Sequence, residues 1–142
     1  MFTYHLSYEE KEALLKLVGF LAQSDQDVSP EERKFVLDLA HDLNVSSEGA
    51  FDDLDGQNLE SLCDAFQRDS AKRVAIVELV DLALADHEYF AEEKAAVRDV
   101  AEVMGISDDE VAKIEDWVAR GQKWHEEGHR LLGLVGDQKV DV

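Results

Sequence analysis

Carboxylates gather in two short segments of the chain, an arrangement that suits a hard divalent cation. Such cations prefer several oxygen ligands at short range, and clustered carboxylates supply them. The two segments could therefore bind a divalent cation (Ca²⁺, Mg²⁺, Mn²⁺ or Zn²⁺) or attract a basic protein partner. The candidate residues are Asp25, Asp27, Glu31 and Glu32 in the first segment and Asp86, Glu88, Glu92 and Glu93 in the second.

The first segment begins like an EF-hand calcium loop, with Asp25-x-Asp27-x-Ser29. An EF-hand needs glycine at the sixth position for its sharp turn and glutamate at the twelfth as a bidentate ligand. Pro30 and Val36 occupy these two positions. The sequence therefore excludes an EF-hand.

Helix capping is the alternative interpretation of the same acids. Ser29 and Pro30 form a strong helix start, and Glu32 can complete a capping box with the serine. Acids in a first helical turn are also stabilised by the helix dipole. That effect does not explain Asp25 and Asp86, which precede the bend at the end of the previous helix. Both interpretations stay open.

A second motif, His125-Glu126-Glu127-Gly128-His129, fits H-E-x-x-H, the zinc-binding signature of metalloproteases. A hydrolase would need a third ligand, and Asp137 is the nearest candidate. Leu132 stands where the extended motif requires glycine. A zinc hydrolase is thus the remote alternative, and a surface helix end, where histidines suit the negative pole of the dipole, is favoured.

The cysteine and the tryptophans are expected to serve packing and contact. Cys63 lies on an apolar helical face, so we expect a buried thiol and no nucleophile. As the lone cysteine it cannot form an internal disulfide, which favours a reducing compartment. Trp117 is expected to pack in the core, and Trp124 to cover part of a partner surface.

Composition narrows the classes of partner. The 142 residues include 33 acidic and 14 basic side chains, for a net charge of −19. Such a surface repels nucleic acid and anionic lipid, so neither is an expected partner. No signal peptide or membrane span is visible, so we expect a cytoplasmic protein without direct membrane insertion, either a monomer or a weak dimer.

Helical spacing of apolar residues recurs along the chain, with a single proline and no strand pattern. The fold class is therefore all-α, with about seven helices in one domain. Capping boxes open helices after Ser7 (with Glu10), Ser29 (with Glu32) and Ser107 (with Glu110). The other expected helices cover about 47–53, 58–66, 70–85 and 91–104, the last ending at Gly105.

The acidic segments belong to an internal repeat. When the chain is shifted by 61 residues, 21–46 and 82–107 align without gaps and share nine identical pairs, Asp25/Asp86 and Glu32/Glu93 among them. The repeat predicts a bundle of two pseudo-twofold-related helix–acidic loop–helix units, at about 8–54 and 70–120. The helical domain is expected over 1–124, with a C-terminal helix end and tail over 125–142.

The motif Ala-Gln-Ser-Asp-Gln-Asp-Val-Ser-Pro-Glu-Glu (22–32) and its echo Ala-Leu-Ala-Asp-His-Glu-Tyr-Phe-Ala-Glu-Glu (83–93) resemble the TerB-like family. This tellurite-resistance group includes the N-terminal domain of DjlA-type co-chaperones. The resemblance implies an all-helical domain associated with tellurite and stress resistance, with suggested divalent-metal binding and no established enzymatic activity. It marks Asp25 with Glu32, and Asp86 with Glu93, as the family's acidic sites.

The sequence thus leaves three functions open. The first is a non-enzymatic stress protein that binds divalent cations or a basic protein partner, or joins a membrane-protein complex, through the acidic loops. The second is an interaction or scaffold module without a metal site. The third is the remote zinc hydrolase. No cofactor other than a divalent cation is implied.

Overall fold

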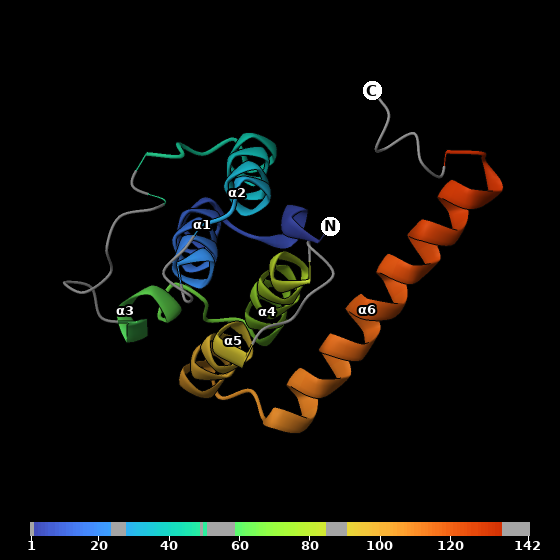
Figure 1. Cartoon of the computed structure of the whole chain (residues 1–142). Helices are drawn as coiled ribbons and strands as arrows, with labels where there is room; N and C mark the ends of the chain where they lie inside the picture. Colours follow the sequence, from blue (N-terminus) through green and yellow to red (C-terminus); the bar gives the residue numbers. More distant parts are fainter. Residues whose placement is uncertain (1, 24–27, 49, 51–58, 85–90, 135–142) are drawn as a thin grey trace.

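The computed structural model describes residues 2–23, 28–48, 50, 59–84 and 91–134, and throughout these residues the regular structure is helical (Figure 1). The all-α prediction is therefore confirmed. The elements are the 3₁₀ turn η1 (Thr3–His5) and the helices α1 (Tyr8–Ala22), α2 (Pro30–Leu43), α3 (Leu59–Cys63), α4 (Asp69–Ala83), α5 (Ala91–Met104) and α6 (Asp108–Leu131).

Two of the predicted capping boxes are complete. At the start of α1, Ser7 Oγ accepts from the Glu10 N–H (3.2 Å), and the Glu10 carboxylate accepts from the Ser7 N–H (2.7 Å). At the start of α2, Ser29 and Glu32 make the same two bonds, both 3.0 Å. Each box satisfies two of the N–H groups that a helix start leaves without partners.

The third capping box forms only by half. Ser107 Oγ accepts from the Glu110 N–H (3.2 Å), as predicted. The Glu110 carboxylate does not reach back, because both of its oxygens accept from Arg73 Nη2 at 2.9 Å. An inter-helix ion pair with α4 therefore replaces the second bond of the box.

The helix predicted over 47–53 is wrong for the residues the structure describes. Residues 45–48 and 50 are non-helical, and 51–53 lie outside the described part. The Glu48 N–H donates to Ser46 Oγ (3.1 Å), a local bond that competes with helix formation. The helix predicted over 58–66 is shorter than expected, since α3 ends at Cys63 and the Phe66 N–H closes a tight turn on the Cys63 carbonyl (3.0 Å).

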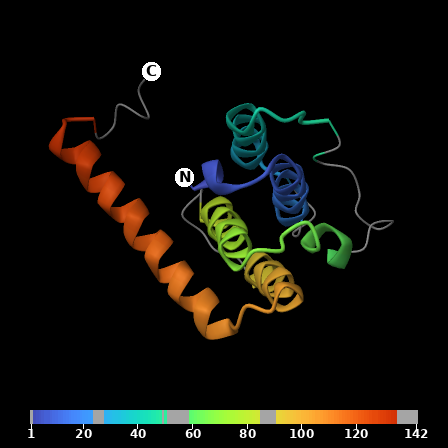
Figure 2. The same cartoon turned by 180° about the vertical axis from the view of Figure 1, so that it is seen from behind.

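Helices α1 and α4 pack against each other at the centre of the bundle, where both views show them side by side (Figures 1 and 2). Helix α2 covers α1, while α5 and α6 pack on α4, and α3 contacts α1 and α5. The apolar faces of the helices are buried. At most 1% of the surface is exposed at Leu14, Leu17, Leu79 and Leu82. The pseudo-twofold relation between the two repeats stays a prediction.

The buried contacts of helix α6 with the bundle lie in its first half, and Gln122 Nε2 donates to Asp81 Oδ1 of α4 (3.4 Å) just beyond it. Val111 and Val118 are its buried residues, and none from 119 to 131 is buried. Figure 1 shows the C-terminal half of the helix extending away from the bundle. The core placement predicted for Trp117 is wrong: this side chain is 42% exposed, because the line through Val111 and Val118 is the one that faces inward. Its ring contacts Phe2, with centroids 5.9 Å apart.

Three helix-interior glycines differ in what surrounds them. A Cβ at Gly19 would lie 1.7 Å from the carbonyl oxygen of Ala50, so glycine there permits a close backbone approach. A Cβ at Gly121 or Gly128, both in α6, would meet nothing within 4 Å. Glycine in a helix interior costs about 1 kcal/mol relative to alanine. No contact in the described part of the chain accounts for the two glycines of α6.

Across the described residues, none of the helices combines the length and the apolar character that a membrane crossing requires.

Candidate functional site

The described members of the acidic segments lie in the first turns of α2 and α5. Glu31 and Glu92 are exposed, whereas Glu32 and Glu93 are buried, at 6% and 3% exposure. In each pair the first carboxylate therefore faces solvent and the second faces the protein. The other four candidates, Asp25, Asp27, Asp86 and Glu88, lie outside the described residues.

The Glu32 carboxylate is occupied by its own helix. Its Oε1 accepts from the Ser29 N–H (3.0 Å) in the capping box. Its burial leaves little carboxylate surface for a ligand from solvent. Glu32 thus stabilises the start of α2, whatever the exposed acids beside it bind.

Metal-ligating side chains do not converge in the described part of the chain. No group of three or more His, Cys, Asp or Glu residues there could hold a metal ion. Half of the predicted ligands lie outside that part, so the cation site stays a prediction.

The two histidines of the H-E-x-x-H motif lie together on α6. The ring centroids of His125 and His129 are 4.5 Å apart, as expected for residues one helical turn apart. They belong to the half of α6 that extends from the bundle. Asp137, the third ligand considered for a zinc site, lies outside the described residues.

Cys63 is buried, as predicted, with 4% of its surface exposed. Burial, followed by the charges of Asp64 and Glu60, raises the pKa of its thiol to about 11. The thiol is therefore protonated at neutral pH, which disfavours a nucleophilic role.

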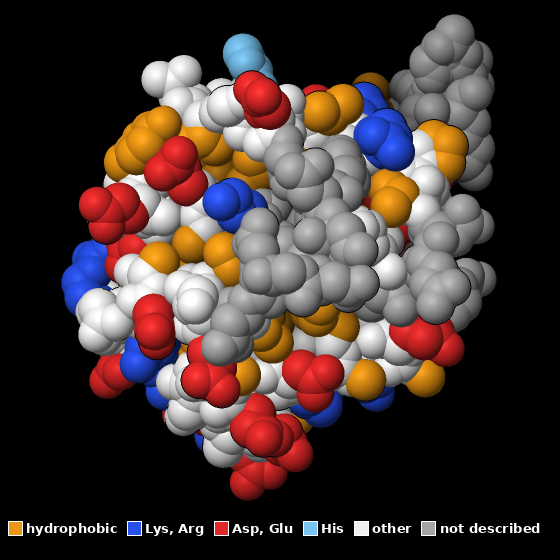
Figure 3. All heavy atoms as spheres, turned by 90° about the vertical axis from the view of Figure 1, so that its left-hand side faces the viewer, with side chains coloured by type: hydrophobic (Ala, Val, Ile, Leu, Met, Phe, Trp, Pro, Cys, Tyr) orange, Lys and Arg blue, Asp and Glu red, His pale blue; other side chains and the backbone are white. Residues whose placement is uncertain are grey.

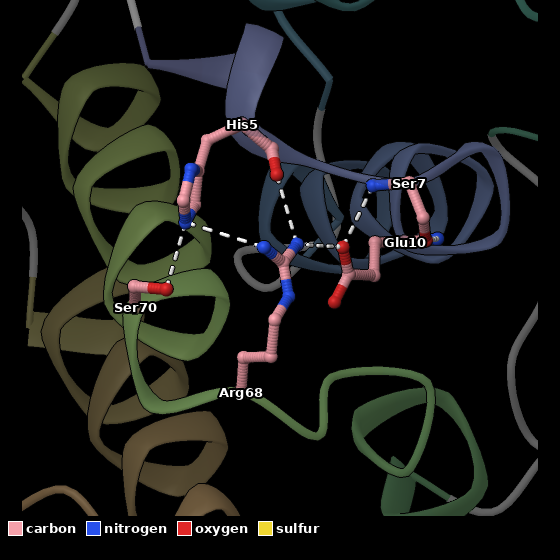
Figure 4. Close-up of polar contacts among 5 residues, drawn as sticks. All are labelled: His5, Ser7, Glu10, Arg68 and Ser70. Carbon is pink, nitrogen blue, oxygen red and sulfur yellow. Dashed lines mark hydrogen bonds and ion pairs between the residues drawn. The ribbon is translucent and has the colours of Figure 1, made fainter.

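A polar network that the sequence did not predict joins η1, α1 and α4 (Figure 4). Arg68 Nη2 donates to Glu10 Oε1 (2.6 Å) and to the His5 carbonyl (2.8 Å). The His5 ring lies 2.8 Å from Ser70 Oγ, measured from Nε2. Burial tends to raise the pKa of Glu10, but the Ser7 N–H and the Arg68 guanidinium together hold it below its ordinary value.

The network stabilises the buried carboxylate of Glu10. Glu10 is 4% exposed, and an ionised carboxylate at that depth needs a charged or hydrogen-bonded partner. Arg68, just before α4, supplies it across 58 positions of sequence. No sequence pattern links the two residues, because their pairing depends on how α1 and α4 pack.

A hollow of about 310 Å³ lies between α3 and α5. Its lining residues in the described part of the chain are Glu60, Asp64, Glu102 and Val103, of which three are acidic. Figure 3, which views the molecule from the side away from α6, shows acidic side chains spread among basic and hydrophobic ones.

The comparison with protein families matches residues 50–116 to the family described as tellurite resistance protein TerB. The matched part runs through α3, α4, α5 and the first turns of α6, and it includes the second acidic segment. The first acidic segment precedes it. The match agrees with the resemblance of the second acidic motif, at 83–93, to the TerB-like family. Neither a curated protein nor a solved structure matches the chain.

Proposed function

Because residues 50–116 are TerB-like, we propose that the chain is a non-enzymatic domain of the tellurite-resistance type that binds a basic protein partner. The binding residues are the exposed acids at the two interhelical segments, with Glu31 and Glu92 as the described members. A stress-response role in the cytoplasm belongs to the same proposal. A partner within a membrane-protein complex would fit it as well.

The observation that carries the proposal is the division within each acidic pair. Glu31 and Glu92 are exposed, while Glu32 and Glu93 are buried. A divalent cation needs several oxygens that converge on one point. Within the described residues each of the two helix starts presents one exposed carboxylate of its acidic pair, and this spacing favours a basic protein surface, which can meet charges spread over a larger area.

A divalent cation is the second candidate ligand. In favour of it, each exposed glutamate is preceded in sequence by two further acids, Asp25 and Asp27 before Glu31, and Asp86 and Glu88 before Glu92. The third function, a zinc hydrolase, has less support, because two histidines on one helix are fewer than the three protein ligands of a catalytic zinc site.

Thermal unfolding of the metal-stripped protein separates the two ligands. We expect millimolar Ca²⁺, Mg²⁺, Mn²⁺ or Zn²⁺, in ~0.15 M salt, to raise the melting temperature by at most one or two degrees, through general screening of the −19 charge. A specific site at 100 times its dissociation constant would add about 2.7 kcal/mol and several degrees.

The control is the double variant Asp25→Asn/Asp86→Asn, measured in parallel. Equal small shifts in both proteins would support a partner-binding function. A shift of several degrees that the double variant loses would show a cation site and contradict the proposal.

A further inference from the structure

An apolar stripe runs along α6 from residue 117 to residue 131. Trp117, Trp124 and Leu131 are seven residues apart and are 42%, 75% and 88% exposed. The ring of Phe2 contacts the ring of Trp117. Two tryptophans and a leucine in one exposed line are unusual for a surface helix, and such stripes mark interfaces.

Two glycines lie on the same face of the helix, at Gly121 and Gly128. They alternate with the tryptophans, so the face reads Trp117, Gly121, Trp124, Gly128, Leu131. Glycine weakens a helix interior, and neither residue is required by a contact within the described chain. Gly19, by contrast, is required by Ala50. Close approach of a second helix would account for both glycines of α6.

We propose that α6 binds α6 of a second copy of this chain in an antiparallel pair. When Trp124 of each copy faces Gly121 of the partner subunit, the same register places Trp117 against Gly128 of the partner subunit. Each indole then fills the hollow left by a glycine, as a knob fills a hole in a coiled coil. The twofold symmetry makes every such contact twice.

Charge complementarity supports the same register. Arg120 and Glu127 lie seven residues apart on one flank of the stripe, and both are exposed. The antiparallel register brings Arg120 against Glu127 of the partner subunit, and Glu127 against Arg120 of the partner subunit. Flanking pairs of this kind set partner and orientation in coiled coils. The intrahelical bond from Arg120 to Asp116 is exposed and therefore easily exchanged.

The charge distribution also explains why a chain of net charge −19 can pair here. Between 117 and 131 there are three basic residues (Arg120, Lys123, Arg130) and two acidic ones (Glu126, Glu127), so the excess of acids lies elsewhere in the chain. An antiparallel pair keeps the two acidic bundles at opposite ends. A parallel pair would bring the bundles together and set tryptophan against tryptophan and glycine against glycine.

Sedimentation equilibrium of the full chain, from ~10 μM to ~1 mM in ~0.15 M salt, tests the proposal. We expect a monomer–dimer equilibrium. Glu127→Arg should raise the dimer dissociation constant at least about tenfold, because it sets arginine against Arg120 of the partner subunit. Glu126→Arg is the matched control: the charge change is identical, but the residue lies off the stripe, and the constant should not rise.

Two further variants test the antiparallel register. Arg120→Glu should weaken self-association like Glu127→Arg, yet an equimolar mixture of these two variants should associate. Gly128→Ala should raise the melting temperature of the dilute protein, since alanine favours the helix, while it weakens the dimer. A wild type that stays monomeric at ~1 mM, a mixture that fails to associate, or equal effects of Glu126→Arg and Glu127→Arg would each overturn the proposal.

Discussion

Replacing Phe66 by alanine is expected to lower the free energy of unfolding by about 3–5 kcal/mol. Among the described residues Phe66 is the largest fully buried side chain, with 1% of its surface exposed, and it belongs to the hydrophobic core cluster. It follows α3, so its ring fixes the connection from α3 to α4 onto the core. The loss combines the transfer of the ring to water with the cavity that it leaves.

Urea denaturation with an unchanged m-value would measure this loss. Tyr4→Ala is the matched control, because that aromatic side chain is 81% exposed, and its loss should stay within about 0.5 kcal/mol. A cost below about 1 kcal/mol for Phe66→Ala would mean that this residue is not packed as described.

Replacing Arg68 by alanine is expected to lower the free energy of unfolding by about 2–3 kcal/mol at neutral pH. The change leaves the Glu10 carboxylate buried with the Ser7 N–H as its remaining partner in the network. Breaking a fully buried pair costs about 3–5 kcal/mol. The Arg68 side chain is 48% exposed, so solvent screening reduces that figure.

The pH dependence of this cost identifies its origin. Because the pKa of Glu10 is lowered in the folded protein, its ionisation stabilises the fold above the ordinary value of 4.5, and that stability is lost as the pH falls through the folded pKa. The difference in the free energy of unfolding between wild type and Arg68→Ala should therefore be largest near pH 7 and should shrink below pH 4.5.

Urea denaturation from pH 7 down to about pH 3 follows this difference. Lys34→Ala is the control, since the Lys34–Asp38 pair is exposed (76% and 62%) and its loss should change the free energy of unfolding little at any of these pH values. A cost for Arg68→Ala that does not change with pH would point to lost packing of the arginine stem and would contradict the ion-pair explanation.

Local signals predicted most of the fold. Helices α1 and α2 begin where the Ser7 and Ser29 capping boxes place them. Helix α5 ends at Met104, directly before Gly105, whose φ of 80° requires a residue tolerant of the left-handed region. These features depend on residues within one or two turns, so a sequence displays them directly.

Features set by packing between distant elements were missed. Trp117 and Val118 lie on adjacent lines along α6, and the spacing of the apolar residues does not indicate which of these lines packs on the bundle. The structure shows that Val118 packs there and that Trp117 is exposed. The bond from Arg68 to Glu10 spans 58 positions and arises only when α1 and α4 meet. At the third capping box the bond from the Ser107 N–H to the Glu110 carboxylate is missing, because that carboxylate binds Arg73.

The candidate site was predictable in part for the same reason. The spacing of Ser29 and Glu32 predicted the capping box that the structure shows, but not that the Glu32 side chain is buried. Glu93, the matching residue of the second repeat, is buried as well, although no serine precedes its helix at that spacing. How the remaining acids are arranged depends on residues outside the described part.

Titration of a fluorescent oligolysine peptide with the full chain, in ~0.15 M salt, tests the proposed function most directly. Glu31→Gln/Glu92→Gln should weaken binding at least about threefold more than Asp108→Asn/Asp109→Asn. The second variant removes the same charge from the first turn of another helix, α6, outside the two acidic segments. Equal weakening by both variants would mean that the peptide senses only net charge, and would contradict a basic-partner site at the acidic segments.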